Sequence, residues 1–185
     1  MGSLVQGLKS TEYPLGQELA MAQVRWYATY TCANHEKQVA AQVQSRALEC
    51  FLPLYRSVRR WKDRRVTLDL PLFPGYLFVR LALRDRLRVL QIPSVVHLVS
   101  FSGQPMPIPD DEMDRLRRGL SHSPCAEPHP FLTAGRRVSI IRGPLAGCEG
   151  ILLRRRKNNF RFVISIDLIR SACAVDVDAA DVQPI

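Results

Sequence analysis

The segment PLFPGYLFVR, residues 71–80, constrains the fold of this chain more than any other stretch of its sequence. After the Pro-Gly turn, the side chains of a strand alternate between two faces, so Tyr76 and Phe78 share one face while Leu77 and Val79 share the other. Both faces are apolar. The pattern predicts either a strand buried between two layers or a strand with one face kept for a partner. Burial is the more common outcome for apolar strands.

The composition is that of a basic globular protein. The 185 residues include 26 Lys and Arg against 17 Asp and Glu, which gives a net charge of +9 and a pI near 9.8. This balance favours polyanionic partners. The five cysteines are scattered and form no C-x-x-C, so we expect reduced thiols in a cytoplasmic protein. No apolar run reaches membrane length, and residues 1–21 lack the core of a signal peptide, so they are expected to form a disordered tail.

The first two thirds of the chain alternate between strand and helix patterns. Asn34 is predicted to cap the first helix. The order of elements predicts an α+β fold with one mixed sheet and helices packed on it, broadly ferredoxin-like. We expect strands at 24–31, 50–58, 65–70, 75–83 and 95–101, and helices at 35–48, 84–91 and 110–119.

The pattern changes after residue 120. The segment 121–130 carries three prolines and few apolar residues, as a linker does. Short strand patterns separated by turn residues follow, which predicts a small antiparallel barrel. The sequence therefore predicts a tail at 1–21, a first domain at 22–119, a linker at 120–132 and a second domain at 133–185.

A cluster of basic residues surrounds Trp61 in RSVRRWKDRR, residues 56–65, at the tip of a predicted hairpin. Cations that bind phosphates, together with an aromatic plane that stacks on an unpaired base, are the chemistry of a nucleic-acid contact. A solvated hairpin is the alternative, because runs of charge often do no more than face water.

Enzyme and metal chemistry find little support in the sequence. His122, Cys125 and His129 lie in a Pro-rich segment without a fourth ligand, so we expect no zinc site. The motifs of phosphate-binding loops, zinc proteases and serine hydrolases are absent. We predict a protein that is not an enzyme and holds no metal and no cofactor. A cysteine-dependent enzyme is the alternative. Loss of an activity when one Cys is replaced by Ser would support that alternative.

Three motifs in order resemble the NusG family of transcription elongation and antitermination factors, over roughly residues 24–185. WYATYT and LFPGYLFV resemble its N-terminal NGN domain, and GRRVSIIRGPLAGCEGILL resembles its C-terminal KOW motif. The resemblance implies a ferredoxin-like NGN domain followed by an SH3-like KOW barrel. LFPGYLFV and the segment from Cys50 to Pro53 are most similar to the specialised RfaH-like and UpxY-like paralogues, which act on particular long operons.

The resemblance also implies partners and contact residues for a monomeric protein. The NGN domain is expected to bind the clamp helices of the largest RNA polymerase subunit through Tyr30, Phe73, Pro74, Tyr76 and Phe78. Upstream DNA and the displaced non-template strand are expected to contact His35, Lys37, Arg56, Arg59, Arg60, Trp61, Lys62, Arg64 and Arg65. The KOW barrel is expected to bind Rho or a small-subunit ribosomal protein through Leu168 and Ile169.

Three points remain open in the sequence. Cys32 and Ala33 stand where specialised paralogues carry basic residues, which leaves the target DNA element undefined. Some paralogues refold the C-terminal domain as a helical hairpin, but the many β-branched residues here favour a barrel. An RNA- or ribosome-binding KOW protein is the alternative function, and it would have no need of an aromatic patch on the first domain.

Overall fold

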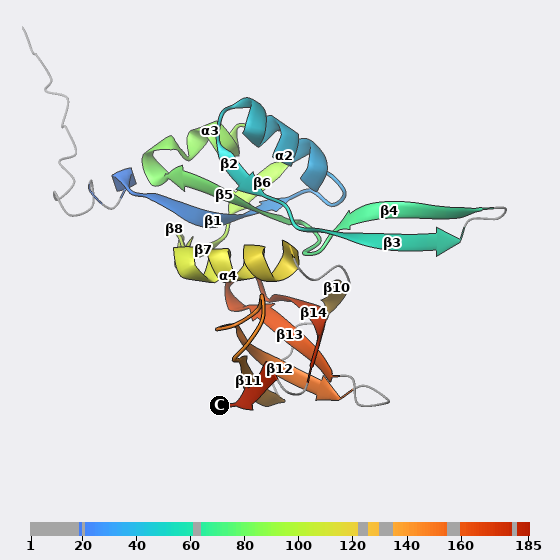
Figure 1. Cartoon of the computed structure of the whole chain (residues 1–185). Helices are drawn as coiled ribbons and strands as arrows, with labels where there is room; N and C mark the ends of the chain where they lie inside the picture. Colours follow the sequence, from blue (N-terminus) through green and yellow to red (C-terminus); the bar gives the residue numbers. More distant parts are fainter. Residues whose placement is uncertain are drawn as a thin grey trace, which may run out of the picture.

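The computed structural model describes Leu19 and residues 21–60, 64–121, 126–129, 135–154, 160–178 and 181–185. Most of the expected tail, together with Trp61 and Lys62, lies outside these residues. Figure 1 shows two sheets with helix α4 (Asp110–Ser121) between them. The fold is mixed α+β, and strands predominate.

The N-terminal sheet is centred on β1 (Val24–Thr31). One edge of β1 pairs with β5 (Tyr76–Ala82), whose far edge pairs with β2 (Glu49–Phe51). The other edge of β1 pairs with β6 (Val95–Leu98) and, further along, with β9 (Pro107–Ile108). Every pairing is antiparallel. Because β1 and β5 are each paired on both edges, they are the inner strands of the sheet.

Helices cover both faces of this sheet. Helix α2 (Glu36–Ser45) and the short helix α3 (Leu87–Leu90) lie on the face where Leu77 and Val79 are buried. Helix α4 lies on the opposite face, where Phe78 is buried (Figure 1). The alternation predicted for this strand is confirmed, and the fold itself covers both apolar faces. A 3-10 turn, η1 (Leu83–Asp85), leads from β5 to α3.

Two hairpins project from the N-terminal sheet. The longer consists of β3 (Leu54–Arg60) and β4 (Arg65–Pro71), and it extends well beyond the sheet in Figure 1. The shorter consists of β7 (Ser100–Phe101) and β8 (Gln104–Pro105). A long two-stranded ribbon of this kind has little core of its own, so we expect its surface to serve contacts with other molecules.

The C-terminal region forms a second antiparallel sheet, in the order β10-β14-β13-β12-β11-β15. Gly150 lies where a Cβ would come within 2.3 Å of the Val163 carbonyl oxygen, so only glycine fits there. The described pairing is an open path from β10 to β15, and closure into a barrel stays a prediction. The strands are β10 (Glu127–His129), β11 (Arg136–Ile140), β12 (Glu149–Arg154), β13 (Phe160–Ile166), β14 (Ser171–Val177) and β15 (Val182–Pro184), with the 3-10 turn η2 (Asp167–Ile169) before β14.

Helix α4 joins the two sheets through apolar contacts. Met113 and Leu116 on α4 belong to the same buried cluster as Cys148 and Ile164 of the C-terminal region. A Cβ on the α4 glycine, Gly119, would come within 2.1 Å of Leu145, so the absence of a side chain there permits close packing. The two regions therefore share one continuous apolar core.

Several element boundaries differ from those predicted. The strand expected at 50–58 is divided between β2 and β3, because Pro53 has no N–H to donate to a ladder. Asn34 does not cap α2. It has φ +65°, a conformation that asparagine tolerates well, and His35 precedes the helix without a side-chain cap. Residues 127–129, expected within the linker, form β10.

Candidate functional site

Three aromatic rings stand in a row across neighbouring strands of the N-terminal sheet. Tyr30 on β1 is directly opposite Tyr76 on β5 and His97 on β6. Its ring centroid lies 5.1 Å from that of Tyr76 and 5.3 Å from that of His97. Tyr30 is 37% exposed, His97 is exposed and Tyr76 is half-buried. We call these three residues the aromatic row, and it forms an accessible aromatic surface on rigid strands.

A tight turn supports the aromatic row. The Tyr76 N–H donates to the Phe73 carbonyl at 3.0 Å across Pro74 and Gly75, and Gly75 has φ +83°. Proline followed by glycine with positive φ is the arrangement that a type II turn requires. Thr31 fixes the turn to β1, because its N–H donates to the Gly75 carbonyl at 2.8 Å and its hydroxyl donates to the same oxygen at 3.3 Å.

Burial also affects the chemistry of Tyr76. The pKa of its phenol is raised above the ordinary value, mainly because burial disfavours the charged form and secondly because Tyr30 is close. The phenol is protonated at neutral pH, as an ordinary tyrosine also is, and can donate a hydrogen bond. An aromatic side chain with one apolar face and one polar tip is well suited to a protein interface.

The prediction that Phe73 and Phe78 present an exposed patch is wrong. Both side chains are 0% exposed. Phe78 packs edge-on against Phe73 with ring centroids 5.9 Å apart, and it stacks on Phe51 at 6.2 Å. Of the expected partner contacts on this strand and turn, only exposed Pro74 and half-buried Tyr76 reach the surface.

A charged network fastens α4 over these buried rings. The Arg117 guanidinium lies 5.4 Å from the Trp26 ring and 5.6 Å from the Phe51 ring. Arg117 also forms an ion pair with Glu49 at 2.9 Å, and Glu49 pairs with Arg80 at 3.4 Å. These contacts hold α4 against the face of the sheet that carries Phe78, so that α4 covers this face. The helix begins more than thirty residues after Phe78 in the sequence.

The β3–β4 hairpin carries exposed arginines close to its tip. Arg60 is directly opposite Arg65, and like charges in that position destabilise a ladder unless an anion neutralises them. Arg56 pairs weakly with Asp69, with Nε and Oδ1 3.9 Å apart and both side chains exposed. Exposed side chains are also found at Arg59 and Arg64, whereas Trp61 and Lys62 lie outside the described residues.

His35 and Lys37 lie at the start of α2, and both are exposed. The Nδ1 atom of His35 is 2.6 Å from the Ser94 hydroxyl oxygen, in the loop before β6. The intervening residue, Glu36, contacts the Gly75 turn. The structure therefore brings this pair of expected nucleic-acid contacts to the same end of the sheet as the aromatic row.

Comparison with known proteins identifies the family. The family model described as "Transcription termination factor nusG" matches residues 24–117, which is more than half of the chain. The chain belongs to the NusG family. The match covers the N-terminal sheet with its helices, so this region is the NGN domain of the family. The protein is a non-enzymatic transcription termination/antitermination factor.

Individual NusG proteins are similar along most of their length. The transcription termination/antitermination protein NusG of Haemophilus influenzae is 24% identical over 187 residues, which cover 91% of this chain and 98% of that protein. The Salmonella typhi protein of the same name is 23% identical over 172 residues, covering 86% of this chain and 95% of the relative. A solved structure concerned with domain interaction in Thermotoga maritima NusG is 23% identical, with a TM-score of 0.56 over 89% of this chain and 99% of that one. The last likeness shows a shared fold.

The C-terminal contacts expected of a NusG-family protein are less exposed than predicted. Ile169 is buried and Leu168 is half-buried, and both pack against the main apolar cluster. A direct contact would need both side chains at the surface, and only Leu168 is partly accessible there. The turn η2 directs them inwards, a feature that a short polar-apolar sequence such as DLIR does not reveal.

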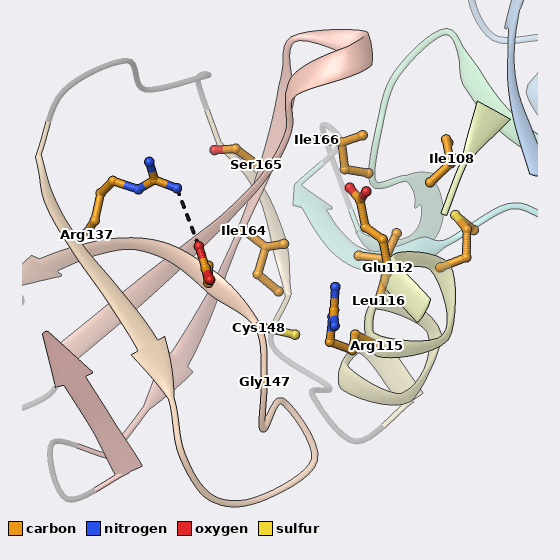
Figure 2. A pocket seen from close by; sticks show the side chains of 12 residues that line it. Ile108, Glu112, Arg115, Leu116, Arg137, Gly147, Cys148, Ile164, Ser165 and Ile166 are labelled. Carbon is orange, nitrogen blue, oxygen red and sulfur yellow. Dashed lines mark hydrogen bonds and ion pairs between the residues drawn. The ribbon is translucent and has the colours of Figure 1, made fainter. Parts of the chain in front are cut away.

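A cavity of about 370 Å³ lies between α4 and the C-terminal sheet. Figure 2 shows α4 side chains such as Glu112 and Arg115 facing Cys148 and Ile164 across it. The Arg137–Glu149 ion pair, with its nitrogen and oxygen 3.5 Å apart, lies at its side. No sequence pattern indicated this cavity, because its walls come from two separate regions.

Thiols, metals and membranes add no further site within the described part of the chain. Cys32, Cys50, Cys148 and Cys173 are free thiols. No group of three or more His, Cys, Asp or Glu side chains is placed to hold a metal ion among the described residues. None of the helices described here is long and apolar enough to cross a membrane.

Proposed function

We propose that this NusG-family protein binds the clamp helices of the largest RNA polymerase subunit through the aromatic row and Pro74. The observation that carries the proposal is the exposed ring of Tyr30, held between Tyr76 and His97 on three adjacent strands. Aromatic side chains on a rigid sheet lose little conformational entropy on binding and are frequent interface anchors. Phe73 and Phe78 contribute by supporting the strand and turn from within the core.

The β3–β4 hairpin is proposed to contact upstream DNA and the displaced non-template strand. The position of Arg60 directly opposite Arg65 in the ladder supports this role, because a phosphate between the two side chains would relieve their repulsion. His35 and Lys37 would extend the same basic surface along α2. We include Trp61 and Lys62 among the proposed DNA contacts only because of their position in the sequence between the two strands of the hairpin.

The C-terminal region, residues 133–185, is proposed to be an SH3-like KOW barrel that recruits Rho or a small-subunit ribosomal protein. Its antiparallel strands and the GRRVSIIRGPLAGCEGILL motif support this assignment. Leu168 is the accessible part of the proposed contact, and Ile169 supports it from below. The ferredoxin-like NGN domain would occupy residues 22–119, and a linker at 120–132 would connect it to the barrel. We expect a cytoplasmic monomer, specialised for particular operons in the manner of RfaH-like and UpxY-like paralogues.

An elongation assay with purified RNA polymerase tests this function. Paused and full-length transcripts are followed in time with no factor, with the wild type and with a Tyr30→Ser/Tyr76→Ser variant. We expect the wild type to change pause lifetimes and the double variant to restore those of polymerase alone. No effect of the wild type on any template, with retained binding to ribosomes or RNA, would favour the ribosome-binding alternative.

A further inference from the structure

A buried carboxyl group lies directly behind the aromatic row. Glu36, in the first turn of α2, is 3% exposed although it is a charged residue type. Its Oε1 accepts a hydrogen bond from the Gly75 N–H at 2.7 Å. None of the ion pairs among the described residues includes Glu36, and the hydrogen bond from Gly75 is the side-chain contact found for it there.

Gly75 in turn contacts Tyr30. A Cβ placed on Gly75 would lie 3.1 Å from Cε2 of Tyr30, so the tyrosine ring packs directly on the glycine backbone. The next residue, Tyr76, is the cross-strand neighbour of Tyr30. A shift of the Gly75 peptide would therefore displace both tyrosines. The hydrogen bond from Gly75 to Glu36 ties this peptide to a helix on the opposite face of the sheet.

We propose that Glu36 is a positioning residue, which holds the Pro74-Gly75 turn so that Tyr30 and Tyr76 present their rings to RNA polymerase. The proposal rests on the proposed polymerase contact for its functional consequence. An apolar side chain at this buried position would avoid the desolvation of a carboxyl group, so the acidic residue is not the choice that maximises core stability. A buried polar residue in place of an apolar one is expected mainly at functional sites, where a particular geometry is needed.

Three variants separate positioning from plain stability. Glu36→Leu removes the acceptor and leaves the Gly75 N–H without its partner. Glu36→Gln keeps an oxygen acceptor at the same distance along the side chain. Val43→Ala is the matched control, because Val43 is a fully buried α2 residue that packs in the core away from the turn.

Two measurements are made on the full chain at a temperature where every variant is folded. The first is affinity for core RNA polymerase. The second is the NMR chemical shifts of the Gly75 amide and α protons, which respond to the Glu36 hydrogen bond and to the Tyr30 ring. We expect Glu36→Leu to lose about tenfold in affinity and to move both Gly75 resonances. Glu36→Gln and Val43→Ala should stay within about twofold of the wild-type affinity, with the Gly75 resonances in place.

The proposal is overturned if Glu36→Leu keeps the Gly75 shifts, or if Val43→Ala loses as much affinity as Glu36→Leu. If the Leu variant does not fold, the Gln variant decides, because a large loss of affinity with unchanged Gly75 shifts would contradict positioning. Failure of the wild type to bind polymerase would refute the proposed function instead, and the chemical shifts would still decide whether Glu36 holds the turn.

Discussion

Cys173 is the most deeply perturbed titratable residue among those whose shifts are described. It is 0% exposed, and burial raises the pKa of its thiol to about 12, with the nearby Cys148 thiol adding to the shift. The folded state therefore holds the thiol proton at pH values where the unfolded chain, with an ordinary pKa near 9, has released it. Because the folded state then binds more protons, the stabilisation is complete below pH 9 and falls as the pH rises.

We expect the free energy of unfolding of the wild type to fall by about 1.4 kcal/mol for each pH unit between roughly 9 and 12, through this group. Urea denaturation of the wild type and of Cys173→Ala at several pH values measures it. The difference between the two proteins removes the contribution of other groups that titrate in this range. Parallel profiles for the two proteins would show that Cys173 does not carry the effect.

The residues of PLFPGYLFVR show how far sequence alone can reach. Alternation predicted the opposite directions of Phe78 and Leu77, because the geometry of a strand imposes them. It could not predict that Phe78 is covered, since that depends on Phe51 and on Arg117 of α4, distant in sequence. The sequence shows Glu36 only as an acidic residue near the start of a predicted helix, and its contact with Gly75 appears only in three dimensions.

Among the elements, the β3–β4 hairpin gives the clearest test of nucleic-acid binding. Replacing Arg60 by Glu exchanges a repulsive pair with Arg65 for an attractive one, so we expect the free energy of unfolding to stay unchanged or rise by about 0.5 kcal/mol. Affinity for single-stranded or forked DNA should fall, and the slope of log affinity against log salt should decrease by about 1 to 2. Titration of labelled DNA at several salt concentrations measures both quantities.

Arg136→Glu serves as the control for the hairpin variant. Arg136 is an exposed arginine on β11 of the C-terminal sheet, and its replacement changes the net charge equally. If both variants weaken DNA binding to the same extent, the effect reflects overall charge and the hairpin has no special role.

Element type was easier to predict than element ends. The periodicity of residues 35–48 predicted α2 because Val39 and Val43 face the core at helical spacing. Its cap was assigned to the wrong residue, since Asn34 adopts a left-handed conformation that removes it from the cap position, and the helix ends at Ser45, three residues before the predicted end. The strand β10 within the expected linker was missed, because Glu127–His129 gains its structure from pairing with β14.

At the scale of the whole molecule, α4 is shared by the two regions. Its Met113 and Leu116 lie in one apolar cluster with Cys148 and Ile164, and Gly119 fits tightly against Leu145. The cavity of about 370 Å³ beside these contacts shows that side chains do not fill all of the space between α4 and the C-terminal sheet. The sequence could not predict this arrangement, because a linker pattern carries no information on whether the joined regions touch.

A side chain at position 119 should separate the two regions. We expect Gly119→Leu to displace Leu145 and to expose the Cys148 thiol, which is buried and has a raised pKa in the folded chain. Its reaction with a thiol reagent near neutral pH should be at least about tenfold faster than in the wild type, as expected when burial no longer disfavours the thiolate. Mass spectrometry of the labelled peptides identifies the reacting cysteine.

Asp114→Leu is the control for this interface, because Asp114 is an exposed residue of the same helix. It should leave the reactivity of Cys148 unchanged. Equal labelling of Cys148 in the wild type and in Gly119→Leu would show that α4 and the C-terminal sheet do not shield the thiol as the structure indicates.

The direct test of the central claim is the affinity of the full chain for purified core RNA polymerase. The wild type is compared with Tyr30→Ser/Tyr76→Ser and with Phe101→Ser, a control at a side chain that is 72% exposed outside the aromatic row. We predict that the double variant binds at least about tenfold more weakly, because aromatic anchors dominate interface energies, and that the control binds like the wild type. Equal affinity of the double variant and the wild type would contradict the claim that the aromatic row binds the polymerase.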